Sequence, residues 1–263
     1  MNVYQDFIKT KTEYSIPSGI DVSSLPYDLF PHQRDLTLWA LRRGRSAIFA
    51  DTGLGKSRMQ IAWVDQVSKH GGKVLILAPL AVAEQTVREG RSIGVDINHA
   101  REDCHIKDGI NITNYDRIHK FDCRKFTGVV LDESSIIKHH AAKTLAHLMD
   151  AFSSTPYKLC ATATPAPNDF TELGNHAEFL GVCTRSEMLS EYFIHDGGET
   201  QTWRLKGHAR QAFWRWVASW GAMVRSPGDL GHDSSMYQLP PLEIHQHVIE
   251  TPVDDVTVQP PPA

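Results

Sequence analysis

Residues 50–57 read Ala-Asp-Thr-Gly-Leu-Gly-Lys-Ser, and the rest of the chain is best understood outward from them. An apolar run at 46–50 precedes them and a helical pattern at 56–68 follows, so a buried strand, a glycine-rich turn and a helix come in succession. This is the order of a P-loop, with Ala50 in place of its first glycine. We expect the turn and the helix N-terminus to bind phosphate through backbone N–H groups. The expected nucleotide-binding residues here are Thr52, Gly53, Leu54, Gly55, Lys56 and Ser57.

A second element of such a site is a pair of carboxylates, and residues 129–133 (Val-Val-Leu-Asp-Glu) place one at the end of a buried strand. In an open parallel sheet the carboxyl ends of the strands gather at one edge, so Asp132 is expected beside Ser57. These two residues would ligate Mg²⁺, which prefers oxygen ligands, while Lys56 would neutralise the β- and γ-phosphates of ATP. Glu133 would polarise the attacking water. The predicted catalytic residues are therefore Lys56, Asp132 and Glu133.

Strand and helix patterns alternate along most of the chain, which predicts an α/β fold with a mostly parallel central sheet flanked by helices. Expected strands lie at 46–50, 73–78, 110–113, 129–132 and 157–161, and expected helices at 31–43, 56–68, 81–91, 141–152 and 169–180. We divide the chain into a lead-in with little structure (1–28), an ATP-binding lobe (29–182), a C-terminal helical extension and linker (183–242) and a tail (243–263). Helices are expected near 186–193 and 208–224, and a further strand at 243–250.

Composition is that of an ordinary globular protein, with 41% hydrophobic and 22% charged residues. No apolar run is long enough to span a bilayer, and the first twelve residues lack a signal-peptide core, so a cytoplasmic location is expected. The four cysteines form no CxxC pair, which favours scattered reduced thiols over a metal site. The net charge of −4 argues against bulk attraction to nucleic acid and leaves room for a local basic groove.

Six short motifs occur in the order typical of one family. They are Gln33, ADTGLGKS (50–57), APLAVAEQTVRE (78–89), ITNYDRI (112–118), LDESSIIK (131–138) and CATATPAPNDFTEL (160–173). Over residues 29–242 the chain resembles the first RecA-like lobe of superfamily-two, Swi/Snf-like helicases and translocases of the DEAD/DEAH type. Residues 195–220 resemble a segment of phage and prophage helicases, which implies a bacterial host or a phage-infected cell.

The resemblance implies roles for individual residues. Gln33 would hydrogen-bond adenine, and Thr162 and Thr164 would couple the nucleotide site to movement of two lobes on DNA. The residues that would touch the nucleic-acid backbone, without reading its sequence, are Pro79, Gln85, Thr86, Thr113, Asn114 and Tyr115. Ordinary strand-end and helix-cap polar groups remain the alternative for these two segments. The expected function is ATP-dependent translocation on DNA, most simply duplex DNA.

Two departures from the family pattern matter. Ser135 stands where many members have a histidine, which places the coupling between nucleotide and DNA sites in question. The second RecA-like lobe, with its arginine that reaches the γ-phosphate, is absent from these 263 residues. The chain is then a fragment, or it has a partner lobe, or it acts alone. An isolated half-motor with little hydrolysis is the main alternative function, and a phage packaging ATPase would leave Gln33 and Thr162 unexplained.

Four of the six tryptophans, at 203, 214, 216 and 220, are interleaved with arginine and lysine. Phe213, Trp216, Val217 and Trp220 follow helical spacing and are expected to form a core stripe. Trp203 and Trp214 lie off that stripe and are the better candidates for contact with nucleic-acid bases. The fourteen histidines show no ligand spacing and are expected at the surface.

Overall fold

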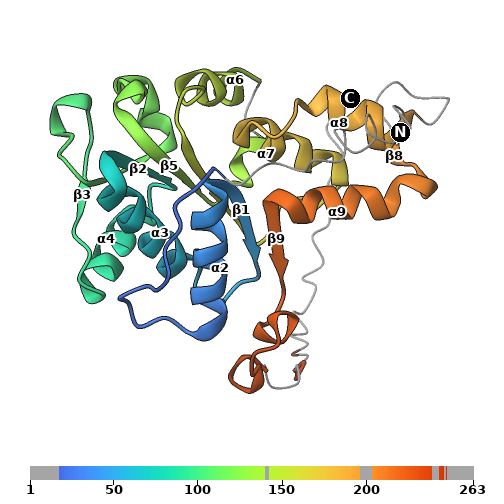
Figure 1. The fold of residues 1–263 in the computed structure, drawn as a ribbon, viewed down its shortest axis with the longest axis horizontal. Coiled ribbons are helices and arrows are strands. Elements are labelled where there is room, and N and C mark those ends of the chain that lie inside the picture. Colours follow the sequence, from blue (N-terminus) through green and yellow to red (C-terminus); the bar gives the residue numbers. More distant parts are fainter. Residues whose placement is uncertain (1–17, 140–141, 196–202, 239–242, 246, 248–263) are drawn as a thin grey trace, which may run out of the picture.

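The computed structural model describes residues 18–139, 142–195, 203–238, 243–245 and 247. Its centre is a sheet of seven strands in the order β3-β4-β2-β5-β6-β1-β9, and every neighbouring pair is parallel (Figure 1). The strands are β1 (Arg45–Ala50), β2 (Lys73–Ala78), β3 (Ile97–His99), β4 (Ile110–Asn114), β5 (Phe126–Asp132), β6 (Tyr157–Ala161) and β9 (Gly221–Val224). Strands β1, β2, β4 and β6 are buried along almost their whole length, as the strands of a parallel sheet covered on both faces must be, whereas the edge strand β9 is partly exposed.

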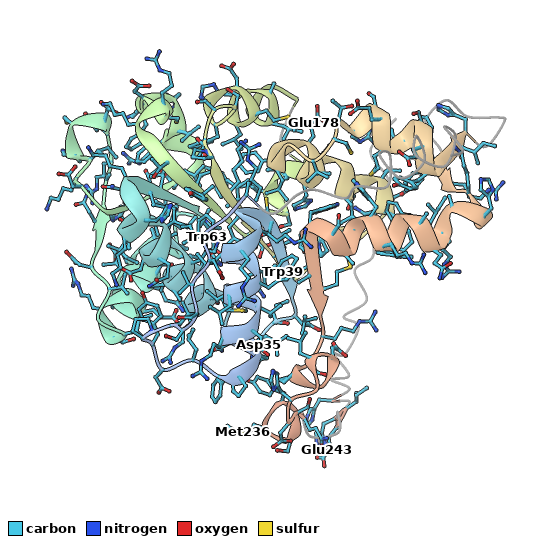
Figure 2. All side chains as sticks on the ribbon, in the orientation of Figure 1. Asp35, Trp39, Trp63, Glu178, Met236 and Glu243 are labelled. Atoms are coloured by element: carbon cyan, nitrogen blue, oxygen red, sulfur yellow. The ribbon has the colours of Figure 1, made fainter. Side chains whose placement is uncertain are left out.

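Helices cover both faces of the sheet. On one face lie α2 (Pro31–Arg43), α3 (Lys56–Gly71) and α4 (Ala83–Ser92), and on the other lie α6 (Ala142–Ala151), α7 (Leu173–Leu180) and the end of α9 (Arg210–Trp220). Helix α8 (Arg185–Tyr192) packs on α7 and lies away from the sheet. Successive residues of β1 serve the two layers in turn: Ile48 packs with α2 and α3, and Phe49 packs with α7 and α9. Side chains fill both layers (Figure 2), and Trp63 of α3 is completely buried.

Local sequence explains where α2 begins and ends. Pro31 occupies its first turn, where a missing N–H costs nothing, and Gly44 ends it with φ of 74°. Gly19 lies so close to the end of this helix that a Cβ there would be 1.9 Å from the carbonyl oxygen of Leu41. The part of the lead-in that is described, from residue 18, forms no helix or strand, yet Ile20 packs into the core. The expectation of a segment with little regular structure holds for residues 18–28, and residues 1–17 lie outside the described part.

The α/β architecture and its mostly parallel sheet are confirmed. Strands β2 and β6 and helix α2 have the expected bounds, and α3 runs three residues further, to Gly71. The helix expected at 208–224 is wrong at its end: it stops at Trp220, and Gly221–Val224 form β9 beside β1. The four residues of β9 are apolar or small, and they directly follow a helical stripe of apolar residues. The sequence therefore does not reveal that the spacing changes there from that of a helix to that of a strand. Residues 243–245 and 247 are not in a strand, and the rest of the strand expected at 243–250 lies outside the described residues.

The C-terminal extension is helical in α8 and α9, and it adds a two-stranded antiparallel pair, β7 (Phe193–His195) and β8 (Trp203–Leu205), that was not expected. The boundary at residue 182 stays a prediction, although β9 returns the chain to the central sheet. After β9 the expected linker contains two short 3-10 turns, and His232 there contacts Asp35 of α2 at 2.8 Å. Among the described residues, no helix is long and apolar enough to cross a membrane.

Candidate functional site

The glycine-rich turn joins β1 to α3 as expected. Gly53 and Gly55 have φ of 84° and 76°, a region that disfavours other residues. A Cβ added at Gly53 would meet nothing within 4 Å, so the turn faces open space there. The ammonium group of Lys56 donates to the carbonyl oxygens of Ala50 and Asp51, at 2.9 and 3.1 Å. Burial lowers the pKa of Lys56, and the carboxylates of Glu133 and Asp132 oppose that shift.

The acidic pair lies at the carboxyl end of β5, against the first turns of α3. Gln60 is on the same face of α3 as Ser57 and Lys56, and its Nε2 donates to Oδ1 of Asp132 at 2.8 Å. Burial is the largest cause of a raised pKa at Asp132, and this hydrogen bond opposes it. Lys56 and Asp132 thus lie close enough for each charge to affect the other, and Ser57 follows Lys56 at the start of α3; ligation of Mg²⁺ by Ser57 and Asp132 stays a prediction.

Glu133 has a strained backbone. Its φ of 53° is the one positive value among described residues other than glycine. Oε1 of Glu133 accepts hydrogen bonds from the hydroxyl groups of Thr162, at 2.7 Å, and Ser135. The N–H of Thr164 in turn donates to the Thr162 hydroxyl at 3.1 Å. The predicted coupling residues are thus linked directly to the predicted catalytic carboxylate, and the serine that replaces a histidine takes part in the same network.

Two residues near the acidic pair were missed from the sequence: Gln60, which holds Asp132, and His176, whose ring lies 3.1 Å from the Ser134 hydroxyl. A third, Tyr115, was predicted to touch nucleic acid, and its hydroxyl donates to the carbonyl oxygen of Asp132 at 2.7 Å. His176 is fully buried and packs edge-on against Phe49. Only the periodicity of α3 gave a signal, since Gln60 lies one turn after Lys56. Tyr115 and His176 reach the site through the tertiary fold.

The histidines are a correction to the sequence-based expectation. His32 and His176 are 1% and 0% exposed, although all histidines were expected at the surface. Each has a buried polar partner, which is how a fold accommodates such a side chain. His32 contacts the carbonyl oxygen of Leu54 in the P-loop at 3.2 Å, and burial lowers its pKa.

Gln33 lies beside His32 and contacts the same P-loop carbonyl. Its Nε2 donates to the oxygen of Leu54 at 3.1 Å, and its Oε1 accepts from the N–H of Phe30 at 3.2 Å. A Cβ at Gly55 would come within 2.3 Å of the Gln33 amide nitrogen, so the two are closely matched. Recognition of adenine by Gln33 stays a prediction; in the structure its amide fastens α2 to the phosphate-binding turn.

The residues predicted to touch nucleic acid differ in exposure. Gln85 is exposed and Pro79 half-buried. Thr86 is buried, with its hydroxyl bonded to the carbonyl oxygen of Val82 at 3.1 Å. The side chains of Thr113, Asn114 and Tyr115 are buried as well, so a contact there would involve the backbone or require movement.

A polar hollow lies next to these segments, at the same edge of the sheet. Its volume is about 400 Å³, and it is lined by the loop between β2 and α4 with the first turn of α4, by the end of β3 and the loop after it, and by the 3-10 turn after β4. Its polar side chains come from Glu84, His99, Arg101 and Arg117. Sequence reasoning missed the three basic residues: His99 and Arg101 belong to no motif, and Arg117 lies in the 112–118 motif but was given no role there. No group of three or more potential metal-ligating side chains occurs in the described part of the chain.

The chain was compared with known proteins. The model of the SNF2-related domain family matches residues 32–215. Among solved structures, the Sulfolobus solfataricus SWI2/SNF2 ATPase core is similar in two forms. The free core domain has a TM-score of 0.63 at 19% identity, covering 88% of this chain and 48% of the other. The core in complex with double-stranded DNA has a TM-score of 0.60 at 20% identity, covering 80% of this chain and 46% of the other.

The UvsW helicase from bacteriophage T4 is also similar, with a TM-score of 0.50 at 15% identity, covering 69% of this chain and 66% of that one. A search of curated proteins finds no match. This chain spans about half the length of the Sulfolobus proteins. The likeness to solved structures concerns the fold, whereas the family match covers more than half of the chain. The chain therefore belongs to the SNF2-related domain family and has the fold of a superfamily-two helicase and translocase ATPase lobe.

Proposed function

We propose that this chain is the nucleotide-binding lobe of an ATP-driven DNA translocase or helicase. The observation that supports it most directly is the hydrogen bond from Gln60 to Asp132, because it fixes the acidic residue against the helix that begins with Lys56. A strand-end carboxylate, a lysine and an open glycine turn at one place form the arrangement that phosphoryl transfer needs. Gln33 and residues 52–57 would bind ATP, and Ser57 and Asp132 would hold Mg²⁺.

The residues present fit a magnesium nucleotide. Gly53 leaves open space above the turn, and Asp132 and Ser57 offer the oxygen ligands that the ion prefers. Bound Mg²⁺ would neutralise developing charge on the phosphate oxygens. Lys56 would leave its two backbone carbonyls for the phosphates, because a phosphate is a stronger partner for an ammonium group than a neutral carbonyl. Glu133 would accept the proton or orient the water, held in place by Thr162 and Ser135.

DNA would run along the carboxyl edge of β2, β3 and β4. The polar hollow beside Pro79 and Gln85 supports this path for DNA, because its Arg101 and Arg117 offer positive charge to phosphates without reading bases. Exposed Gln85 would contact the backbone directly, and residues 113–115 would do so through the main chain. The protein as a whole is acidic, so the attraction would be local. A duplex is the simplest substrate.

A second RecA-like lobe would complete the motor. Its arginine would stabilise the transferred phosphoryl group, a contribution worth about 10³–10⁵ in rate in related enzymes. The alternative is an isolated half-motor that binds nucleotide and turns it over slowly. The coverage of about half of the Sulfolobus proteins suits either form.

Steady-state hydrolysis distinguishes the two. ATP turnover by the chain would be measured with and without duplex DNA, alone and with an added second lobe from a relative, beside Glu133→Gln and Lys56→Ala variants. Turnover that DNA stimulates and both variants abolish supports a working motor. Binding of ATP without turnover until the second lobe is added supports the half-motor. Turnover that survives Glu133→Gln contradicts the proposed site.

A further inference from the structure

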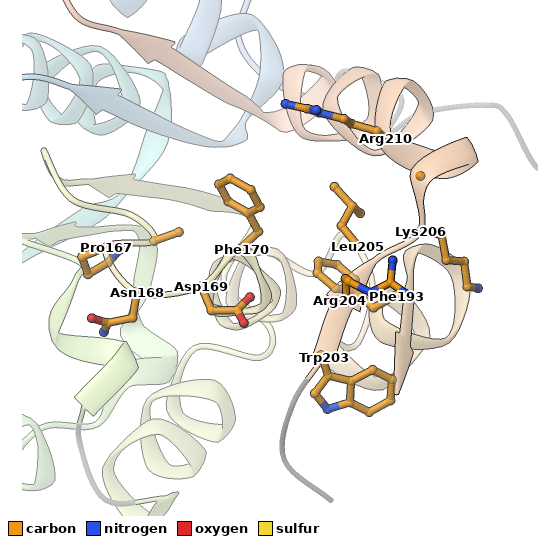
Figure 3. A pocket seen from close by; sticks show the side chains of 12 residues that line it. Pro167, Asn168, Asp169, Phe170, Phe193, Trp203, Arg204, Leu205, Lys206 and Arg210 are labelled. Carbon is orange, nitrogen blue, oxygen red and sulfur yellow. The ribbon is translucent and has the colours of Figure 1, made fainter. Parts of the chain in front are cut away.

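A groove separates the loop that follows the Thr162–Thr164 motif from the C-terminal extension. Its volume is about 640 Å³, within the range of ligand sites, and Figure 3 shows it from close by. One wall is the loop at 166–170, which leaves the carboxyl end of β6, and the other is β8 with the start of α9. A second hollow of about 770 Å³ continues it along α9, and the two share Gly207 and Arg210.

Aromatic rings are exposed along this groove. Phe170 is 45% exposed, and its ring meets that of Trp214 edge-on, with centroids 5.0 Å apart. Trp203 is partly exposed at the other end of the groove, as Figure 3 shows. Trp216 and Trp220 belong to the buried core instead. The core stripe and Trp214 are thus separated as the helical spacing predicted, and the exposed ring of Phe170 and the partly exposed rings of Trp214 and Trp203, the last in contact with His195, remain accessible to a ligand.

Positive charge surrounds the rings. Arg204 and Arg210 line the groove, and Arg215 lines the adjoining hollow; all three are exposed. Lys206 is directed to α8, where its Nζ donates to the carbonyl oxygens of Ser190 and Glu191. One carboxylate, Asp169, lines the same space, and it accepts a hydrogen bond from the N–H of Thr171. Among the described residues that line the groove and the adjoining hollow, the guanidinium groups of Arg210 and Arg215 outnumber the carboxylate of Asp169, on a protein of net charge −4.

Aromatic faces between arginines are the combination that holds unpaired nucleic acid. Bases stack on the rings without regard to sequence, and phosphates pair with the cations. A duplex presents phosphates but keeps its base faces covered by neighbouring bases, so it would leave the rings unused. The loop at 166–170 continues from Thr164, so a strand in the groove would touch the segment linked to Glu133.

We propose that this groove binds an unpaired nucleic-acid strand, with bases on Phe170, Trp214 and Trp203 and phosphates at Arg204, Arg210 and Arg215. This is a site separate from the hollow at Arg101 and Arg117. It rests on the proposed function in one respect, that the substrate is DNA, and adds that this substrate includes a single-stranded part such as a flap or fork.

The test uses fluorescence anisotropy with a labelled oligothymidylate of about 12 nucleotides, within the site size of single-strand binders, and a blunt duplex of the same length. Gly207→Glu is the sharpest variant, because a Cβ at Gly207 meets nothing within 4 Å and its backbone is not left-handed. The Gly207→Glu variant adds a carboxylate between the arginines. Its control is Gly207→Gln, which adds a side chain of the same size without the negative charge. Phe170→Ala removes one stacking face, and Lys107→Ala removes one charge from the opposite edge of the sheet, just before β4.

We expect the oligothymidylate affinity to fall about tenfold or more in Gly207→Glu, and by roughly five- to 150-fold in Phe170→Ala, the range for loss of one stacked base. Gly207→Gln should lose much less, and Lys107→Ala nothing measurable. Duplex affinity and Mg·ATP binding should be unchanged in all four. The proposal is overturned if the wild type does not bind the oligothymidylate, if both groove variants bind as the wild type does, or if Lys107→Ala weakens binding equally. If the wild type does not bind Mg·ATP, the proposed nucleotide site is refuted, and the oligothymidylate measurement still tests the groove on its own.

Discussion

Thr162→Val tests whether the contact between the Thr162 hydroxyl and Glu133 positions the catalytic carboxylate. The side chain is fully buried, and valine keeps its shape while removing the 2.7 Å hydrogen bond to Oε1 of Glu133 and the oxygen that accepts from the N–H of Thr164 at 3.1 Å. A hydrogen bond to a charged group contributes about 1.5–3 kcal/mol. Glu133 keeps the Ser135 hydroxyl as a second hydrogen-bond donor. If the whole contribution is expressed in the transition state, kcat falls about 10- to 150-fold.

Steady-state ATP hydrolysis with duplex DNA, together with nucleotide affinity from equilibrium titration, measures the effect. We expect kcat to fall while the Kd for ATP stays within about twofold, because Thr162 contacts the carboxylate and not the P-loop. Thr155→Val is the matched control: it is the same change at a buried hydroxyl, near the other end of β6. An unchanged kcat in Thr162→Val, or an equal loss in Thr155→Val, would refute a specific positioning role.

Further predictions concern stability and the nucleotide site. Burial raises the pKa of Asp132, so keeping this carboxylate ionised lowers the free energy of unfolding. This destabilisation is fully present above the pKa of Asp132 in the folded protein, and it is lost as the pH falls through that pKa. Asp132→Asn should therefore raise the Tm at pH 7–8, by an amount that shrinks toward acidic pH in a calorimetric series, while abolishing hydrolysis; a lower Tm at neutral pH would contradict this. Gly55→Ala should cost about 2–3 kcal/mol in denaturant titration, roughly 1–2 from the left-handed φ of 76° and about 1 from the displaced Gln33 amide. The same change in a Gln33→Ala background should cost about 1 kcal/mol less, and equal costs in both backgrounds would show that Gln33 is not the obstacle. The hydroxyl of Thr113 is buried without a hydrogen-bond partner among the described residues, so Thr113→Val should stabilise the fold by about 1 kcal/mol, and a destabilised variant would reveal a partner for that hydroxyl.

Much of the fold follows from local pattern. The continuous apolar runs of β2 and β6 and the proline and glycine that bound α2 specify their elements without reference to the rest of the chain. The P-loop and the acidic pair were likewise predictable, because parallel strands bring their carboxyl ends to one edge. Gly221–Val224 were mistaken for helix because four small or apolar residues after a strong helical stripe do not reveal whether the period changes.

The remaining part of the site depends on tertiary packing. His176 meets Ser134 from 42 residues away, and Tyr115 reaches Asp132 from the 3-10 turn that follows β4. No pattern distinguishes His176 from a surface or core side chain, and the motif that contains Tyr115 did not indicate its contact with Asp132. The basic hollow at Arg101 and Arg117 also forms only when separate loops meet, so no single stretch of sequence marks it. The groove between the loop at 166–170 and α9 was predictable in part. Helical spacing separated Trp214 from the core stripe, but it did not place Phe170 beside Trp214.

The most direct test of the nucleotide site is calorimetric titration of the chain with ATP, with and without Mg²⁺, beside the Lys56→Ala variant. Lys56 donates to the carbonyl oxygens of Ala50 and Asp51, and the pairing with phosphate proposed for it would be lost in alanine. The account predicts one magnesium-dependent site that Lys56→Ala abolishes or weakens at least tenfold while the Tm of the free protein changes little. Absence of ATP binding by the wild type, or equal binding by Lys56→Ala, would contradict it.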